Sequence, residues 1–395
     1  MPSYRPRSRR CHRCLQGILV ALTLLPIMPV NGDEPTAPST SPVLAPVPTD
    51  GKPLEYWIEQ LDSNQFLRRQ AASKRLLSYG DKVVQPLVDA TSKGRLELTE
   101  RAIAVLQTLA IEQGPDDQEG AWGALTKIAE TGSGSASVRA DAALGIIRRE
   151  RETIAVTRLA AAGVKLGFRE FVIDARSLNE NMVLIDSTWS GDVDALRWLR
   201  WINNVAYAVV QGTAVNADVL NHVVTMPDLR TISLSEAKID SDVFSPLAKM
   251  YRIDELEFRY IKLSAEDGDK IAKLPIRVQL GLMGTGLPRE AEMKLRESLP
   301  GLSIVLKEGG FLGVRCNSFS PVCQIDNVVE GGAAHNAGLE PGDVITDING
   351  TKIARFDDLQ MEVGRHKPDE EIEITFDRRG EVKKVKLKLM RMSAE

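Results

Sequence analysis

The chain has 395 residues, more than one ordinary hydrophobic core requires, and this length predicts two or three domains. Its formal net charge of −4 gives no support for a nucleic-acid binder, because such proteins usually carry a strong basic excess. Four histidines and four cysteines leave little material for a catalytic or metal centre, and we expect no cofactor.

Residues 1–32 have the pattern of an export signal. Five arginines between positions 5 and 13 precede the apolar run 17–30, and small residues surround a cleavage position after Gly32. This run is shorter than the roughly 20 residues that cross a membrane comfortably. We therefore expect an exported protein, periplasmic or extracellular; the alternative is a segment retained as a membrane anchor. Cys11 and Cys14 form a CxxC pair inside this segment, so we assign them no metal.

Residues 33–53 are rich in Pro, Ser, Thr and Ala and show no periodicity, which is typical of an extended linker. From residue 54 to residue 162, apolar residues recur at helical spacing. Gly80 fits the end of one helix, with another helix beginning just after it.

Three partial copies of one pattern lie in this helical region. In each copy an arginine is followed three residues later by an alanine and eight residues later by a large aliphatic residue. Because alanine is small, we expect each of these alanines to lie where two paired helices approach closely. The copies are Arg69, Ala72 and Leu77; Arg101, Ala104 and Leu109; and Arg139, Ala142 and Ile147. This pattern resembles HEAT repeats and implies an α-solenoid; the alternative is an ordinary helical bundle.

Residues 163–307 contain a clearer repeat. Large apolar residues and one alanine recur every 24 positions in four parallel columns, which indicates one structural unit copied along the chain. One column is Ala208, Ile232, Leu256, Leu280 and Ile304, and another is Val210, Leu234, Phe258, Leu282 and Leu306.

This block resembles leucine-rich repeats and implies a solenoid of short strands and helices, without the inward asparagine that many such repeats carry. We expect irregular capping strands at 170–174 and 182–186, and within one unit a helix over 242–250 with Phe244, Leu247 and Met250 facing inward. The strand residues on the opposite face share no charge or aromatic theme, so we expect a solvated surface. They are Tyr207, Val209, Thr231, Ser233, Glu255, Glu257, Gln279 and Gly281.

Residues 308–395 carry the most specific motifs. Gly310-Phe311-Leu312-Gly313-Val314 precedes an alanine-rich segment at 332–339, a predicted buried strand over 344–348 and the turn signal Asn349-Gly350. The alternation over 384–389 predicts a half-buried last strand with its lysines in solvent. The segment resembles a PDZ domain of the type attached to HtrA-type proteases. The fold class is therefore multidomain: a HEAT-like α-solenoid, a leucine-rich α/β solenoid and a small β-rich PDZ domain.

This resemblance implies binding of extended or C-terminal peptides by addition of a strand to a sheet edge. The backbone around Leu312, Gly313 and Val314 would receive the peptide carboxylate, and Phe311 and Leu312 would shape an apolar pocket. The helix over 357–363 would form the other wall through Gln360 and Val363, with Val363 equally explained as core. No histidine begins this helix, so a preference for Ser or Thr in the peptide is not expected.

Cys316 and Cys323 are the cysteines that remain after signal removal. They flank a short turn, and an oxidising compartment favours pairing. We predict a disulfide between them, with two free thiols as the alternative.

The HtrA-type protease domain, the GxSxG elbow and the HExxH motif are all missing from the sequence, and His222, His335 and His366 are isolated. We therefore expect a scaffold without enzymatic activity, whose partners are proteins or peptides and not nucleic acid. It would contact a membrane only through a retained anchor. The first alternative is an adaptor that delivers peptides to a separate protease; the second is a hydrolase with a site between the repeat blocks.

Overall fold

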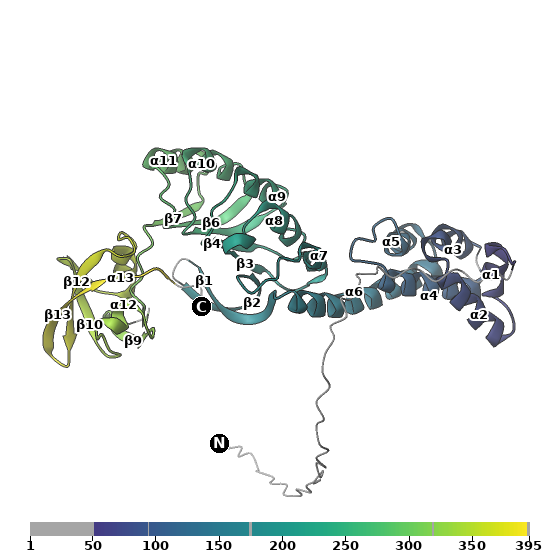
Figure 1. Cartoon of the computed structure of the whole chain (residues 1–395), viewed down its shortest axis with the longest axis horizontal. Helices are drawn as coiled ribbons and strands as arrows, with labels where there is room; N and C mark the ends of the chain where they lie inside the picture. The colour runs from purple at the N-terminus through teal and green to yellow at the C-terminus, as the bar shows by residue number, and fades with distance from the viewer. Residues whose placement is uncertain (1–50, 94, 174–175, 318–319, 393–395) are drawn as a thin grey trace, which may run out of the picture. The chain divides into compact units, whose positions relative to one another are not determined.

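The computed structural model describes residues 51–93, 95–173, 176–317 and 320–392. Helices come first along the chain, then strands that alternate with helices, then a small unit rich in strands (Figure 1). The expected signal at 1–32 and most of the expected linker lie outside the described residues. Within the described ranges, no helix is both long enough and apolar enough to span a membrane.

Six α-helices and one 3-10 turn form the first region, residues 54–161. Their apolar faces share a core that includes Leu61, Leu76, Leu87, Leu106 and Leu125, each fully buried. The last helix is long enough to join a second core, that of the following sheet, through Ala155 and Leu159. The elements are α1 Leu54–Gln60, α2 Phe66–Leu77, η1 Gly80–Val83, α3 Val84–Thr91, α4 Leu96–Glu112, α5 Ala121–Thr131 and α6 Ser135–Ala161.

Two of the three repeated arginines of this region link alternate helices, whereas Arg101 pairs with Glu97 of its own helix. Glu97 on α4 pairs with Arg69 on α2, and Arg139 on α6 pairs with Glu100 on α4. The prediction for the alanines is right at Ala72, which is fully buried, but wrong at Ala104 and Ala142, which are exposed. Neighbouring residues are buried in their place, because the helices of the later copies are rotated relative to the pattern. Ala102 and Ala143 pack in the core instead.

Seven strands form one sheet in sequence order. The first two pair antiparallel as a hairpin longer than the caps expected from the sequence, and each later strand is added in parallel. From the third strand onward most parallel partners lie 24 residues apart, as in Ala208 with Ile232 and Ile232 with Leu256, whereas Val183 and its partner Ala208 lie 25 apart. The strands are β1 Lys165–Ile173, β2 Arg176–Ile185, β3 Tyr207–Gln211, β4 Thr231–Ser235, β5 Ile253–Arg259, β6 Ile276–Met283 and β7 Ser303–Lys307.

Short helices cover one face of the parallel strands (Figure 1). Within the unit singled out from the sequence, the helix is shorter than expected; Phe244 and Leu247 are buried, and Met250 is partly buried against the same core. The elements are α7 Val193–Leu196, η2 Arg197–Trp201, η3 Gly212–Ala214, α8 Ala217–Val223, η4 Ser241–Val243, α9 Phe244–Ala248, α10 Ala265–Ile271 and α11 Arg289–Ser298.

The chain leaves each of four strands in the same way. Gly212, Glu236, Tyr260 and Gly284 all have positive φ angles, between 53° and 63°, and they too are spaced 24 residues apart. A side chain at such a φ is strained, so glycine is the natural occupant and Tyr260 is unusual. The backbone N–H of Glu236, Tyr260 and Gly284 each donates to the last carbonyl of the next strand. The repeat therefore includes the turn as well as the strand.

The opposite face of the sheet is not solvated as the sequence suggested. Thr231, Ser233 and Glu257 are buried, Glu257 with only 1% of its surface exposed. The Ser233 hydroxyl donates to Glu257 Oε2 over 2.8 Å, and Arg259 Nη2 donates to the same oxygen over 2.7 Å. Parallel strands bring side chains of equivalent positions to about 4.8 Å, so in-register neighbours cover one another. The solvated-face prediction is wrong for these positions.

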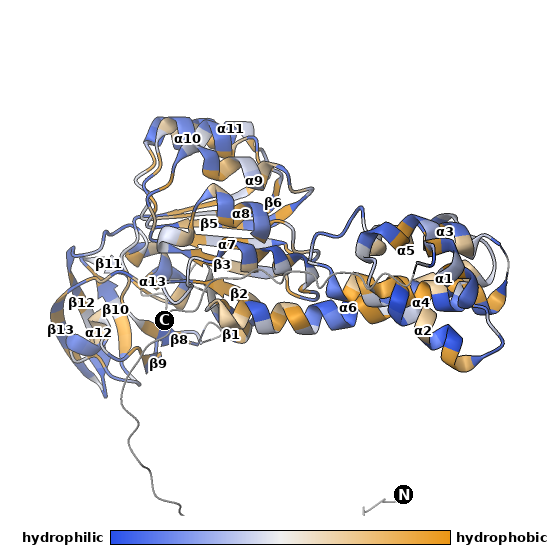
Figure 2. Cartoon of the chain, turned by 45° about the vertical axis from the view of Figure 1, so that its right-hand side comes forward, coloured by the Kyte–Doolittle hydropathy of each residue, from blue (hydrophilic) through white to orange (hydrophobic). Residues whose placement is uncertain are grey.

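The C-terminal unit, residues 308–392, contains a four-stranded antiparallel sheet, a two-stranded ribbon and two helices. Strand β10 is apolar over much of its length and lies in the middle of the core (Figure 2). Asn349 and Gly350 both have positive φ, as the hairpin signal predicts. The elements are β8 Val314–Cys316, β9 Ile325–Val328, α12 Ala333–Asn336, β10 Val344–Ile348, β11 Thr351–Lys352, α13 Phe356–Val363, β12 Glu371–Arg378 and β13 Glu381–Lys388.

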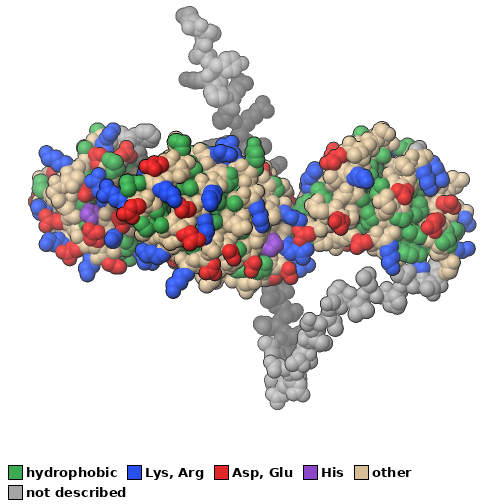
Figure 3. Space-filling view, turned by 90° about the horizontal axis from the view of Figure 1, so that it is seen from above, with side chains coloured by type: hydrophobic (Ala, Val, Ile, Leu, Met, Phe, Trp, Pro, Cys, Tyr) green, Lys and Arg blue, Asp and Glu red, His purple; other side chains and the backbone are tan. Residues whose placement is uncertain are grey.

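The last strand is half buried, as predicted from its alternation. Leu387 faces the core, whereas Lys384, Lys386 and Lys388 are exposed. Lys384 Nζ lies 2.8 Å from Glu373 Oε1 on the neighbouring strand. On the face of the described residues seen in Figure 3, acidic and basic side chains are intermingled.

Candidate functional site

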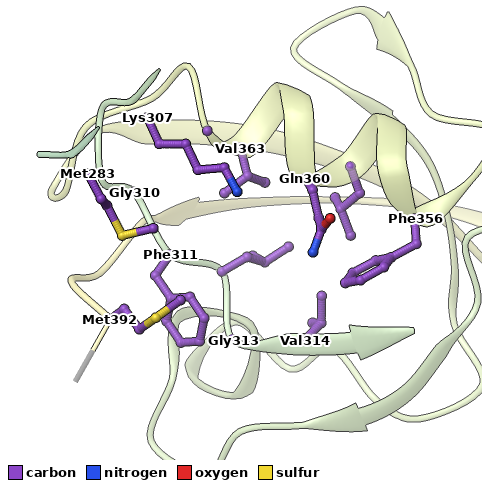
Figure 4. A pocket seen from close by; sticks show the side chains of 13 residues that line it. Met283, Lys307, Gly310, Phe311, Gly313, Val314, Phe356, Gln360, Val363 and Met392 are labelled. Carbon is purple, nitrogen blue, oxygen red and sulfur yellow. The ribbon is translucent and has the colours of Figure 1, made fainter. Parts of the chain in front are cut away.

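A pocket lies between strand β8 and helix α13 in the C-terminal unit. Its cavity volume is about 80 Å³ (Figure 4). All six residues that the sequence analysis assigned to a peptide site line this pocket, so the fold brings together two segments almost fifty positions apart. The lining residues are Met283, Lys307, Gly310, Phe311, Leu312, Gly313, Val314, Phe356, Leu359, Gln360, Val363, Gly364 and Met392.

The loop over 310–313 forms one wall. Two of its carbonyl groups accept hydrogen bonds from other segments of the same domain. The N–H of Ala334 donates to Leu312 O over 2.8 Å, and the N–H of Val329 donates to Gly313 O over 2.9 Å. Within the part of the chain that the structure describes, neither the Leu312 N–H nor the Gly313 N–H donates to a backbone carbonyl. Successive N–H groups that have no backbone acceptor can make a concave site for an anion.

Glycine at position 313 is required by the conformation of this loop. Gly313 has φ of +81°, where a side chain is strained. An added Cβ would lie 3.5 Å from Gly332 Cα, which is an ordinary contact, so strain rather than a clash is the obstacle. The loop is tied at its start to the last residues of the chain, because Phe311 and Met390 exchange both backbone hydrogen bonds, at 2.8 and 3.1 Å.

Helix α13 forms the other wall. Its start is fixed by Asp358, whose Oδ2 accepts the N–H of Arg355 over 3.0 Å and that of Ala354 over 3.1 Å. Leu359 and Val363 are buried and belong to the core while also lining the pocket, so Val363 is a core residue and its part in peptide binding stays a prediction. Gln360 places a polar amide on an otherwise apolar wall (Figure 4).

Sequence reasoning missed two lining residues that precede the C-terminal unit. Met283 ends strand β6, and Lys307 ends strand β7. The domain boundary expected at 307/308 assigned both residues to the repeat block, which removed them from consideration. The signal that could have found Lys307 is its position three residues before the glycine-rich loop. Met283 gave no such signal, because only the pairing of β6 with β7 brings it there.

Tyr260 connects the sheet to this loop. Its hydroxyl donates to Gly309 O over 2.7 Å and accepts the N–H of Met392 over 2.8 Å. Burial raises the pKa of the Tyr260 hydroxyl above its usual value, so it stays protonated and able to donate over the whole neutral range. The side chain therefore holds both Gly309, before the loop, and Met392, the last described residue.

The predicted disulfide is not present in the structure. Cys316 and Cys323 are buried free thiols whose Sγ atoms lie 3.8 Å apart, well beyond the ~2.05 Å of a disulfide. Cys316 pairs with Ile325 across the ribbon, not with Cys323, because strand β9 begins only after Cys323. The hydrogen bond from the Cys323 thiol lowers the pKa of Cys316, and the same contact together with burial raises the pKa of Cys323.

The histidines are not all isolated, contrary to expectation. His366 Nδ1 lies 2.8 Å from Glu370 Oε1, and its Nε2 lies 3.6 Å from Glu362 Oε1. His366 O also accepts the N–H of Gly310 over 2.8 Å, so this histidine supports the loop rather than lining the pocket. No group of three or more His, Cys, Asp or Glu side chains is placed to hold a metal ion among the described residues.

Residues 310–389 match the PDZ domain family, so a PDZ domain occupies this part of the chain, within the boundaries expected from the sequence. No curated protein matches the chain. PDZ domains bind peptides.

Three solved structures illustrate the remaining similarities. The HtrA-type protease AlgW with a decapeptide is 21% identical, with 27% of this chain and 36% of that chain covered and a TM-score of 0.22. The serine endoprotease from Yersinia pestis is 20% identical, with 22% and 30% covered and a TM-score of 0.20. An aminopeptidase N family protein from Idiomarina loihiensis is 23% identical, with 21% and 14% covered and a TM-score of 0.20. The chain thus spans well under half the length of these three structures.

Proposed function

We propose that this protein is a non-enzymatic interaction scaffold whose PDZ groove binds the C-terminal segment of a partner protein. The observation that carries the proposal is the pocket between β8 and α13, where the N–H groups of Leu312 and Gly313, which donate to no backbone carbonyl of the described residues, lie beside an apolar cavity. An extended peptide would run along β8, with its terminal carboxylate on these N–H groups.

The charge and size of the pocket suit such a ligand. Lys307 supplies a cation at the pocket, which would attract a carboxylate. The cavity of about 80 Å³ is about half the size of the ~150 Å³ cavity that holds benzene in another protein, which favours a small aliphatic terminal side chain over an aromatic one. Leu312, Leu359 and Val363 would surround that side chain.

The other two regions would offer further protein-binding surfaces in this proposal. We infer that the helices of 54–161 are HEAT-like repeats and that the seven-stranded sheet is built of leucine-rich repeats, since repeated units of both kinds present broad exposed surfaces. We further propose that the protein is exported, either with a cleaved signal or with a retained anchor. We propose no nucleic-acid partner. A role as adaptor for a separate protease is the alternative.

The first test compares peptides that differ only at the carboxylate. A library of fluorescent peptides with free C-termini is bound to the full chain, and the best binder is then measured as the free acid and as the C-terminal amide. We expect the acid to bind at least about tenfold more tightly, because charge-assisted hydrogen bonds to the loop are lost in the amide. Equal affinity of acid and amide, or no binding by any library member, would overturn the proposal.

The adaptor alternative needs a separate measurement. Envelope proteins captured by the full chain are compared with those captured by the Gly313→Val variant. An adaptor predicts that a protease is captured equally by both proteins, through the repeat regions, while peptide-bearing partners are lost from the variant. The scaffold proposal predicts no protease among the proteins that both forms capture.

A further inference from the structure

The peptide pocket is completed by the seven-stranded sheet and not by the PDZ domain alone. Met283, the last residue of β6, has 5% of its surface exposed and lines the pocket. Figure 4 shows Met283 with Phe311 and Met392 at one end of the pocket, and Phe356 at the other end. Phe311 directly precedes the loop residues Leu312 and Gly313, so this apolar group lies at the end of the groove where a peptide carboxylate would sit.

Hydrogen bonds fix Met283 at this position. Met283 and Lys307 are partners across the parallel pair β6 and β7, and the N–H of Gly284 donates to Lys307 O over 2.8 Å. From Lys307 the chain passes directly into the loop, where the N–H of Glu308 donates to Gly364 O over 2.8 Å. Tyr260 then holds Gly309 O, and its ring would lie 2.8 Å from a Cβ at position 309. The end of β6 is therefore held next to the loop by two neighbours, Lys307 on β7 and Tyr260 after β5.

We propose that Met283 closes the carboxylate end of the peptide groove, so that the groove selects free chain ends over internal segments. This inference rests on the proposed peptide-binding function. A peptide that continued beyond the carboxylate position would have to place a polar peptide group against Phe311, Met283 and Met392. These side chains offer no hydrogen-bond partner strong enough to replace water, which disfavours that placement.

The experiment measures a ratio of affinities in the full-length protein. The best free-acid peptide from the library and the same peptide lengthened by two glycines at its C-terminus are each titrated by fluorescence anisotropy. We expect the lengthened peptide to bind at least about tenfold more weakly to the wild type. In Met283→Ala the ratio should fall to about threefold or less.

Two further variants make the outcome decisive. Met361→Ala removes a methionine that is 60% exposed on α13 and does not line this pocket, and it should keep the wild-type ratio. Met283→Val shortens the side chain while keeping a residue suited to a strand, and it should give an intermediate ratio even if the alanine variant folds poorly. A wild-type ratio in a folded Met283 variant would overturn this inference alone. Absence of free-acid binding by the wild type would instead overturn the proposed function, and this inference with it.

Discussion

The sheet face around Glu257 and the loop around Gly313 both place polar groups in apolar surroundings, but they treat those groups differently. On the sheet, Ser233 and Arg259 both donate to Glu257, so these buried polar groups bind one another. In the loop, the N–H groups of Leu312 and Gly313 are not used by the backbone of the described residues. The difference separates polar groups that stabilise a fold from polar groups that are available to a ligand.

The largest effect is expected when the internal pairing on the sheet is broken. Glu257→Ala would leave Arg259 buried without this carboxylate, which destabilises a protein by about 3–5 kcal/mol. Thermal unfolding followed by circular dichroism should show the loss, while Glu290→Ala on the exposed surface of α11 should show almost none. Equal melting curves for the two variants would mean that the Glu257 pair contributes little.

The loop should respond in the opposite manner, with a larger loss of binding than of overall stability. Gly313→Val forces a β-branched residue to a φ of +81°, a strain of about 1–3 kcal/mol, and should weaken binding of a free-acid peptide more than about tenfold. Gly380→Val is the matched control, because Gly380 also has a positive φ, +89°, but lies in the turn between β12 and β13. Similar peptide affinities for the two variants would show that this loop does not receive the carboxylate.

A smaller effect is expected from the cation beside the loop. Lys307→Met keeps the length of the side chain and its apolar stem but removes the charge, which should weaken binding of the free acid about three- to tenfold and leave the amide unchanged. The wild-type affinity should fall with added salt, and that dependence should diminish in the variant. If acid and amide weaken equally, Lys307 acts through the shape of the pocket rather than through its charge.

The smallest effect concerns an ion pair inside the PDZ domain, between the buried Asp343 and the partly exposed Arg378. Burial acts to raise the pKa of Asp343, but hydrogen bonds from Arg378 and from the Glu340 N–H outweigh it, so the pKa lies below its usual value. The pair therefore stabilises the fold above the unfolded pKa near 4, and this contribution is lost as the pH falls through the folded value. Asp343→Asn should melt at a temperature less sensitive to pH between about 5 and 3 than the wild type.

The strands and the site could be predicted from the sequence where local pattern decides them. The 24-residue columns give the register of β3 to β7, and Phe311-Leu312-Gly313-Val314 gives the loop. The alanine pattern failed at Ala104 and Ala142, because helix rotation depends on packing between helices and not on spacing within one. The solvated-face prediction failed at Glu257, because its cover comes from residues on neighbouring strands. Met283 could not be found at all without the pairing of β6 with β7.

The turn position occupied by Gly212, Glu236, Tyr260 and Gly284 limits how this chain could grow by duplication of its unit. Tyr260 reaches Gly309 and Met392 across a single intervening unit, the one that contains β6. A unit copied before Tyr260 would lengthen the sheet and leave the hydrogen bonds of Tyr260 to Gly309 and Met392 unchanged. A unit copied after Tyr260 would move the loop one strand further away, by about 4.8 Å, which is more than a hydrogen bond can span. The number of repeat units before Tyr260 is therefore free to vary, whereas the number of units after it is fixed.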